Sequence, residues 1–365
     1  MNSPDELAMS EQWDAAGRHD AAIDALARSV RQGNVEAMTR LGKRLLIGDR
    51  APHLPRDGVR FIVDAARAGG AEAAERLAVL AAIGLHVAAS WPEALAAMAL
   101  SADRGWVPAR GQLCALTTDR ALAQEAAGQV HRPSAQVGGK SLWQQLAASV
   151  DAPTARGLPQ PVVLSSEPSV KAFPGLISEA VCEWLIGRAR PRLNRARVYD
   201  SVAARDTVHG TRSNSAATFN LIDADLVQIA TQSRIALSCG VPFQNLEPMA
   251  VLHYETGEQI REHFDFVDPN SPGHAQELAR FGQRMATFLI YLNDSYEGGE
   301  TDFPRLSIRH RGHRREGLCF SNAHPDGAPD MRMVHAGLPP LSGEKWIVSQ
   351  FVRNRGILDS SRPGK

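Results

Sequence analysis

The sequence has few cysteines and no cysteine pair spaced for metal or redox chemistry. Its 365 residues include Cys114, Cys182, Cys239 and Cys319, and none of them lies in a C-x-x-C motif. Scattered thiols of this kind are typical of a reducing compartment. No apolar run reaches the roughly 18 residues of a membrane-spanning helix, and the N-terminus lacks the basic and apolar regions of a signal peptide. We therefore expect a cytoplasmic protein with no membrane partner.

The chain also lacks an excess of charge of either sign. It has 40 Lys and Arg against 40 Asp and Glu, so its formal net charge is zero. Without a net positive charge there is no global attraction to polyanions, and we expect no nucleic-acid partner. Hydrophobic residues make up 44% and charged residues 22% of the sequence, which is an ordinary soluble composition. At this length the chain can form two domains, each with its own core.

The N-terminal third repeats one pattern at a constant spacing of 36 residues. The shared positions are a glycine, an alanine and a leucine: Gly33, Ala37 and Leu41; Gly69, Ala73 and Leu77; Gly105, Ala109 and Leu113. A small apolar face precedes each glycine, so every copy predicts a helix, a Gly-containing turn and a second helix. One helix pair cannot bury its apolar faces alone, and stacking about three pairs makes an α-solenoid. The third copy departs from the pattern, because Arg120 stands where Gly48 and Gly84 close the earlier copies.

These Gly and Ala-Leu positions resemble Sel1-like repeats, which are related to the tetratricopeptide family. The resemblance implies that residues 1–130 form an α-helical repeat domain with a concave surface that binds a peptide or protein. An Ala-rich helical bundle without a groove is the alternative. Residues 131–160 are punctuated by Gly and Pro and predict a linker, with one helix inside it from Ser141 to Val150.

Residues 161–360 predict a second, α+β domain. Two helical segments precede a run of short apolar strands, which indicates helices packed on one sheet of a β-sandwich. His263 and Asp265 are two residues apart on a predicted strand, so their side chains leave the same face. Together with His335, they offer two imidazoles and one carboxylate, which can occupy one face of an octahedral Fe(II) and leave the opposite face open.

A lysine near the predicted metal site separates iron from its main rival. Zinc also accepts His and carboxylate ligands, but open positions beside a basic residue for a bidentate cosubstrate favour iron. Lys345 is predicted on the last strand, pointing inward, and a lysine inside a β-sandwich needs an anion. Thr287 and Tyr291 share one face of another predicted strand, and packing of the domain's interior is one of the roles open to them.

Four segments carry a resemblance to a known family. They are Tyr254-Glu-Thr-Gly257 followed by His263-Phe-Asp265, Tyr291-Leu-Asn-Asp294, Gly298-Gly-Glu-Thr301-Asp-Phe303-Pro304, and His335-Ala-Gly-Leu-Pro339 continuing to Gly343-Glu-Lys345-Trp346. In order and spacing they resemble the prolyl 4-hydroxylase-like branch of the 2-oxoglutarate/Fe(II) dioxygenases, over about residues 165 to 355. The resemblance implies a double-stranded β-helix, or jelly roll.

The resemblance also implies the cofactors and the residues of the site. The expected reactants are Fe(II), 2-oxoglutarate and O2, with ascorbate as a further cofactor. The expected site residues are, for the metal, His263, Asp265 and His335; for 2-oxoglutarate, Lys345, Tyr291, Tyr254 and Thr287; and for a peptide substrate, Arg212. A solvated loop arginine is the alternative for Arg212. Related halogenases lack the carboxylate ligand, so Asp265 argues for hydroxylation.

Three functions remain open on the sequence. The expected one is 2-oxoglutarate- and O2-dependent hydroxylation of a C–H bond, of a prolyl residue in a protein or peptide that the repeats recruit. The alternative is hydroxylation of a free amino acid or small metabolite, with the repeats serving assembly. The third is a catalytically inactive binding scaffold. Succinate release separates the scaffold from the two enzymes, and a comparison of peptides with free amino acids separates the enzymes from each other.

Overall fold

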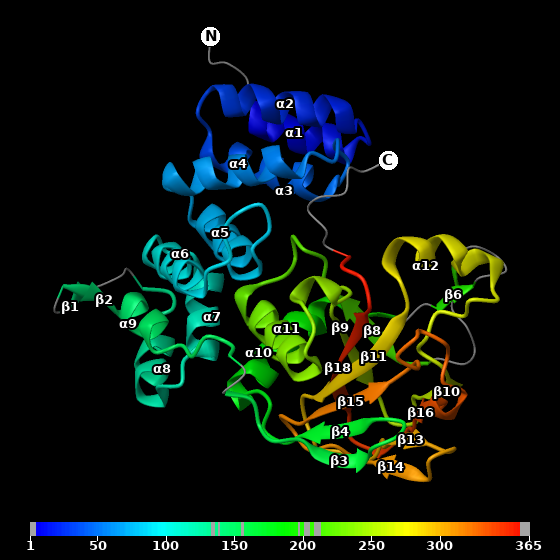
Figure 1. Ribbon diagram of the computed structural model, residues 1–365. Helices are drawn as coiled ribbons and strands as arrows, with labels where there is room; N and C mark the ends of the chain where they lie inside the picture. The colour runs from blue at the N-terminus through cyan, green and yellow to red at the C-terminus, as the bar shows by residue number, and fades with distance from the viewer. Residues whose placement is uncertain are drawn as a thin grey trace. The chain divides into compact units, whose positions relative to one another are not determined.

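The structure, a computed structural model, describes residues 5–132, 136–137, 139–154, 157–195, 198–200, 205–207 and 213–357. The chain divides into two compact units. The first extends to Ala152 and also includes Leu221–Ile229, and the second comprises Pro153–Asn220 and Ala230–Asp359. Figure 1 draws helices α1 to α9 of the first unit in blue through cyan to green and the strands of the second in green to red. No described helix is both long and apolar enough to cross a membrane.

The first unit is a series of helix pairs. Its helices are α1 (Glu6–Ala15), α2 (His19–Arg31), α3 (Val35–Ile47), α4 (Pro55–Arg67), α5 (Ala71–Ile83), α6 (Trp91–Asp103), α7 (Val107–Leu116), α8 (Arg120–Ala127) and α9 (Leu142–Ala148). Helices α2, α4 and α6 begin 36 residues apart, and so do α3, α5 and α7. The predicted helix-turn-helix repeats are therefore confirmed. Short strands β1 (Gln136–Val137) and β2 (Lys140–Ser141) precede α9.

The turns of the repeats follow from their residue types. Gly33, Gly69 and Gly105 all have positive φ, between 82° and 102°, a conformation that costs glycine little. Gly48 ends α3 in the left-handed region with φ 72°, as the Schellman-type C-cap requires. The third copy has no such glycine, and α7 is accordingly shorter and stops at an extended Thr117.

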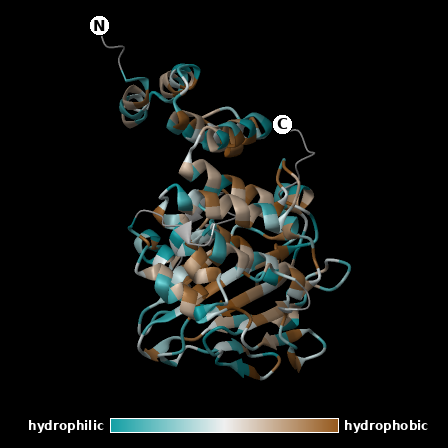
Figure 2. Ribbon diagram, turned by 90° about the vertical axis from the view of Figure 1, so that its left-hand side faces the viewer, coloured by the Kyte–Doolittle hydropathy of each residue, from teal (hydrophilic) through white to brown (hydrophobic). Residues whose placement is uncertain are grey.

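Small residues allow the helices of the first unit to approach closely. A Cβ added to Gly42 of α3 would lie 2.8 Å from the carbonyl oxygen of Gly58 in α4, and one added to Gly58 would lie 2.7 Å from the backbone nitrogen of Leu46. Fully buried alanines such as Ala65 and Ala73 serve the same purpose at other crossings. Teal and brown alternate along these helices in Figure 2, as expected for amphipathic helices that bury one side.

The segment Leu221–Ile229 is held within the first unit by buried polar side chains. Arg76 Nη1 of α5 donates hydrogen bonds to the carbonyl oxygens of Ile222, at 2.9 Å, and Ala224, at 2.7 Å. Gln112 Oε1 of α7 accepts a hydrogen bond from the backbone amide of Leu226 at 2.8 Å. Leu226 is the first residue of α11 (Leu226–Cys239) and is fully buried. This contact between distant parts of the sequence was not expected from the repeat pattern.

The second unit contains two antiparallel sheets. The larger has eight strands in the order β3 (Val162–Ser165), β4 (Val170–Phe173), β15 (Gly317–Ser321), β11 (Arg284–Tyr291), β18 (Lys345–Arg353), β9 (Ala250–Tyr254), β8 (Ser215–Thr218) and β5 (Asn194–Arg195). The smaller has the order β10 (Ile260–His263), β16 (His335–Gly337), β13 (Thr301–Phe303) and β14 (Ile308–His310). Two further pairs are β12 (Glu297–Gly298) with β17 (Pro340–Ser342), and β6 (Val198–Asp200) with β7 (Arg205–Thr207).

The two sheets enclose one apolar core, which confirms the predicted sandwich. The core cluster combines Leu252, Leu289 and Phe320 of the larger sheet with Ile260 and Phe303 of the smaller one. The helices of this unit are α10 (Glu179–Ala189), most of α11, and α12 (Ala275–Phe281). On β18, residues alternate between the two faces of the sheet: Ser349 and Phe351 line a cavity, whereas Gln350 accepts a hydrogen bond from Gln232 of α11 at 2.8 Å.

Candidate active site

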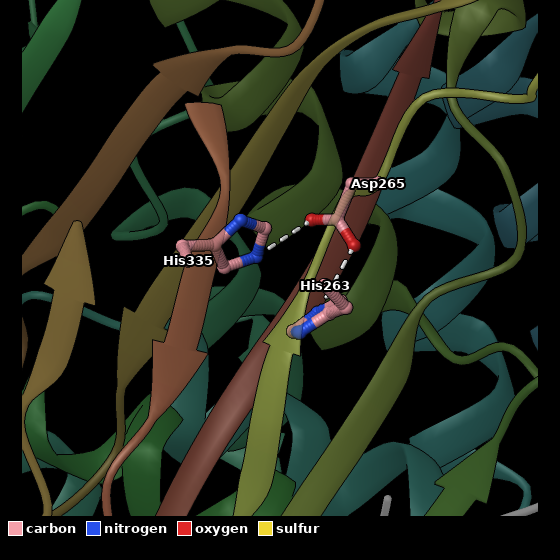
Figure 3. Close-up of side chains that lie close together, drawn as sticks. All are labelled: His263, Asp265 and His335. Carbon is pink, nitrogen blue, oxygen red and sulfur yellow. Dashed lines mark ion pairs between the residues drawn. The ribbon is translucent and has the colours of Figure 1, made fainter. Parts of the chain in front are cut away.

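Two neighbouring strands bring the predicted metal ligands together. Strands β10 and β16 pair antiparallel with His263 directly opposite His335, and β10 ends at His263, so Asp265 lies just beyond the strand. Figure 3 shows both imidazoles beside the Asp265 carboxylate, with one ion pair from each ring to a carboxylate oxygen. All three offer ligand atoms within 4.8 Å of one another. The sequence therefore predicted a cluster that the structure does form.

The hydrogen bonds of the two imidazoles leave the same ring nitrogen free in each. His263 Nδ1 lies 2.8 Å from the carbonyl oxygen of Arg261, and His335 Nδ1 lies 3.1 Å from that of Met333. A carbonyl only accepts, so each Nδ1 carries the proton and each Nε2 has a free lone pair in the neutral ring. The Nε2 atoms lie 3.4 Å and 3.3 Å from the Asp265 carboxylate oxygens. Two Nε2 atoms and one carboxylate are the donor set of a non-haem Fe(II) centre.

The charge state of Asp265 also suits a metal ligand. Burial disfavours its negative charge, but His335 and His263 outweigh this and lower the pKa of the carboxyl well below its usual value. The same pairing acts on His335, where burial opposes the positive charge and Asp265 raises the pKa overall. When a metal cation binds such a carboxylate and its two neighbouring imidazoles, it replaces the proton that these groups share.

Lys345 lies inside the sandwich with little to neutralise it. Its side chain is 1% exposed, and Nζ donates to the carbonyl oxygen of Gly299 at 2.7 Å. Burial lowers the pKa of the ammonium to about 7, and Glu300 only partly offsets this. The rings of Tyr254 and Tyr291 lie beside it, with centroids 5.2 Å and 5.6 Å from Nζ. A buried ammonium with one neutral acceptor fits an anionic partner such as the distal carboxylate of 2-oxoglutarate.

The other residues predicted for the cosubstrate lie in three different environments. Tyr254 lines the cavity that contains the triad and Lys345. Tyr291 is fully buried, burial raises the pKa of its phenol, and its hydroxyl lies 2.9 Å from Thr301 Oγ1. Thr287 donates its hydrogen bond to Asp265 instead, at 2.7 Å, and is not among the cavity-lining residues. Arg212 lies outside the described residues.

Thr301 is a cavity residue that the sequence interpretation passed over. It lines the cavity and is 3% exposed, with its hydroxyl beside that of Tyr291. Strand β13, which carries Thr301, pairs with β16 of the metal site. The signal was present in the segment Gly298-Gly-Glu-Thr301, which is one of the segments of the family resemblance but for which no site residue was predicted.

The cavity has a volume of about 420 Å³ and extends along β18 from Lys345 to a second charged cluster. There, Arg284 Nε and Nη2 donate to the two carboxylate oxygens of Glu247 at 2.7 Å and 3.0 Å. Arg353 Nε donates to the same carboxylate at 2.5 Å. Burial opposes the charge of Arg284, but Glu247 outweighs it and raises the pKa of the guanidinium. Arg284 also lies over the ring of Phe351, 3.9 Å from its centroid.

A second group of possible metal ligands in the described part of the chain is already neutralised. Glu167, His324 and Asp330 lie close enough to share a cation. Arg332, however, donates to both carboxylates, at 2.7 Å to Glu167 and at 2.6 Å to Asp330. The guanidinium therefore takes the place that a cation would need, and we assign no metal to this group.

Comparison with known proteins agrees with this site. The profile of the 2OG-Fe(II) oxygenase superfamily matches residues 249–353. A probable prolyl 4-hydroxylase 3 of Arabidopsis thaliana is 32% identical over 212 residues, which cover 52% of this chain and 71% of that protein. The chain belongs to the 2OG-Fe(II) oxygenase superfamily. It is an oxygenase that uses Fe(II), 2-oxoglutarate and O2, and its relatives include prolyl 4-hydroxylases.

Two solved structures resemble separate parts of the chain. The viral collagen prolyl hydroxylase of Paramecium bursaria Chlorella virus-1, in complex with 2-oxoglutarate, is 25% identical with a TM-score of 0.40 and covers 50% of this chain and 94% of its own. A Sel1 repeat protein from Oxalobacter formigenes is 17% identical with a TM-score of 0.32 and covers 35% of this chain and 54% of its own.

Proposed function

We propose that this oxygenase hydroxylates a prolyl residue in a protein or peptide. The observation that carries the proposal is the combination of the His263, Asp265 and His335 cluster with the buried Lys345 in one cavity. The prolyl 4-hydroxylase relatives supply the substrate class. Phe264, which lines the cavity beside the cluster, gives an apolar wall that suits the pyrrolidine ring of proline.

In this proposal each residue of the site has one task. His263, Asp265 and His335 hold Fe(II), and Lys345 binds the distal carboxylate of 2-oxoglutarate with Tyr291, Tyr254 and Thr301 around it. When bound, the iron and 2-oxoglutarate supply the activation of O2 that C–H hydroxylation requires. The protein binds and orients the reactants, and the buried Lys345 side of the cavity keeps water from the cosubstrate. Ascorbate is expected to stimulate turnover by keeping the metal reduced.

We propose that the repeat unit recruits the protein substrate. We also propose that the protein is located in the cytoplasm. Helix-turn-helix repeats form extended surfaces that bind polypeptides. The four cysteines are widely spaced and form no C-x-x-C pair in the sequence, which is typical of a reducing compartment. If the repeats recruit the substrate, the intact substrate protein will have a lower KM than a short peptide with the same hydroxylation sequence. Equal KM values would argue against recruitment.

The test of the substrate class is mass spectrometry of host proteins treated with the enzyme and with Asp265→Ala as the inactive control. We expect prolyl residues that gain one oxygen only with the unaltered enzyme. Oxygen found on free amino acids or small metabolites, and on no protein, would overturn the prolyl assignment. No 2-oxoglutarate turnover with any substrate would leave a binding scaffold as the function.

A further inference from the structure

Asp265 is held in place differently from the two histidines. His263 and His335 are register partners on paired strands, and a backbone carbonyl fixes each ring. Asp265 lies beyond the end of β10, so strand pairing does not determine where its carboxylate points. Another contact must orient it if it is to act as a metal ligand.

Two side chains supply that contact, Thr287 in the larger sheet and Asn322 directly after its strand β15. Thr287 Oγ1 of β11 donates to Asp265 Oδ2 at 2.7 Å, and Asn322 Nδ2 donates to Thr287 Oγ1 at 2.9 Å. Thr287 and Asn322 are each 1% exposed. The backbone of Asn322 is itself fixed, because its amide donates to the carbonyl oxygen of Met285 at 2.8 Å. The three side chains form a short buried series of hydrogen bonds from one sheet to the metal cluster.

The direction of these hydrogen bonds follows from the groups involved. A threonine hydroxyl has one hydrogen, and the Asp265 carboxylate can only accept it. The oxygen of Thr287 is then free to accept from the Asn322 amide, and each bond polarises and strengthens the next. If the amide were turned around, Asn322 Oδ1 and Asp265 would compete for a single hydrogen. With the amide as it stands, Asn322 Oδ1 is buried without a partner among the described residues.

We propose that Thr287 and Asn322 are positioning residues that orient Asp265 for metal binding. This inference rests on the proposed metal ligands and changes the role expected for Thr287 from cosubstrate binding to support of the carboxylate. Groups that hydrogen-bond to a metal ligand fix its orientation and typically change metal affinity by 10- to 100-fold when removed. Asn322 acts through Thr287, since its amide takes the lone pair and leaves the hydroxyl hydrogen for Asp265.

The test measures Co(II) binding by calorimetry and by the absorption spectrum of the bound metal, without 2-oxoglutarate or substrate. Thr287→Val keeps the shape and removes the hydroxyl, and we expect an affinity lower by about 10- to 100-fold. Thr287→Ser should restore most of the affinity and the wild-type spectrum. Asn322→Asp replaces the donor with an acceptor that competes for the hydroxyl hydrogen, so it should behave like Thr287→Val.

Three comparisons make the result interpretable. Thr39→Val removes a hydroxyl that is also buried but donates to the Val35 carbonyl within α3, and it should leave Co(II) binding unchanged. Melting of the metal-free variants detects any that do not fold. Wild-type Co(II) affinity in folded Thr287→Val, or a Thr287→Ser variant as weak as Thr287→Val, would overturn the proposal. If Asp265→Ala itself binds Co(II) normally, the metal-ligand assignment is wrong instead.

Discussion

His263 and His335 face each other directly across the antiparallel pair β10–β16, with ring centroids 4.3 Å apart. Directly opposed residues in such a pair have Cβ atoms roughly 4.5–5.5 Å apart, so the main-chain register alone brings the two imidazoles together. A carbonyl oxygen then orients each ring through Nδ1. The spacing between the two nitrogen ligands is therefore a property of the sheet and not of a loop.

Removal of the carboxylate should abolish metal-dependent turnover. Asp265→Ala takes away one of the three ligands and also the counter-charge of both histidines, so we expect loss of Fe(II) binding and of succinate formation from 2-oxoglutarate. Asp302→Ala is a matched control, because Asp302 lies on β13 of the same sheet and pairs with the exposed Arg309. Undiminished metal binding by Asp265→Ala would exclude this site as the iron centre.

Lys345→Ala should lower the affinity for 2-oxoglutarate without changing the affinity for Fe(II). A hydrogen bond to a charged group is worth about 1.5–3 kcal/mol, and each 1.4 kcal/mol is a factor of about ten in affinity, so the expected loss is roughly 10- to 150-fold. Iron affinity should stay near the wild-type value, since Lys345 is not among the clustered ligands. Lys345→Arg should keep part of the affinity, because a guanidinium also pairs with a carboxylate. A change in iron affinity without a change in 2-oxoglutarate affinity would contradict the assignment.

The same lysine should make cosubstrate binding dependent on pH. Its pKa in the free protein is about 7, so the amine is increasingly neutral above that pH, whereas a bound carboxylate favours the ammonium. Binding then takes up a proton, and the affinity should fall by up to about tenfold per pH unit as the pH rises above 7. Arginine stays protonated throughout this range, so Lys345→Arg should remove the dependence.

Calorimetry in two buffers with different protonation enthalpies measures this uptake directly. We expect close to one proton taken up per 2-oxoglutarate at about pH 8 and much less at about pH 6. The lysine also affects stability: since its pKa lies below the ordinary 10.5, the unfolded chain binds more protons between these values. The free energy of unfolding should therefore rise with pH across that window. Equal proton uptake by the Lys345→Arg variant would show that another group titrates.

The sequence predicted the site residues that belong to local patterns, and it did not predict contacts that depend on the tertiary path of the chain. His263, Asp265, His335 and Lys345 follow strand periodicity and a family pattern, both of which are local, and the structure brings them into one cavity. Thr287 was identified by its strand face, but a face does not say which neighbour a hydroxyl meets. That depends on the path of the chain after β10, which periodicity does not describe.

The repeats show the same limit at a larger scale. The glycine spacing predicted the three helix pairs α2–α3, α4–α5 and α6–α7, because turns and close crossings need particular residues. The inclusion of Leu221–Ile229 in the first unit had no such signal, since Arg76 and Gln112 bind backbone atoms that any sequence presents. Sequence periodicity therefore does not predict hydrogen bonds between a side chain and backbone atoms that are distant in the sequence.

The last prediction concerns this segment and the stability of the first unit. Arg76→Ala would remove the guanidinium that donates to the carbonyl groups of Ile222 and Ala224, and it would also remove one of the partners of Glu75, 3.1 Å away. Each lost hydrogen bond to a charged group costs about 1.5–3 kcal/mol. We therefore expect a lower free energy of unfolding and faster hydrogen exchange in Leu221–Ile229. Gln112→Ala should act in the same direction by freeing the amide of Leu226.

Arg60→Ala is the control for Arg76→Ala, because Arg60 lies in the same repeat series and its ion pair with Asp57 is at the surface, with side chains 65% and 45% exposed. Surface pairs are worth about 0–1 kcal/mol, so its unfolding and exchange should be close to wild type. A truncated protein that begins near residue 160 lacks both Arg76 and Gln112. It should be less stable, because the hydrogen bonds from these side chains to Leu221–Ile229 are lost. Wild-type exchange of Leu221–Ile229 in Arg76→Ala would show that the segment is held by apolar packing of residues such as Leu226 and not by the arginine.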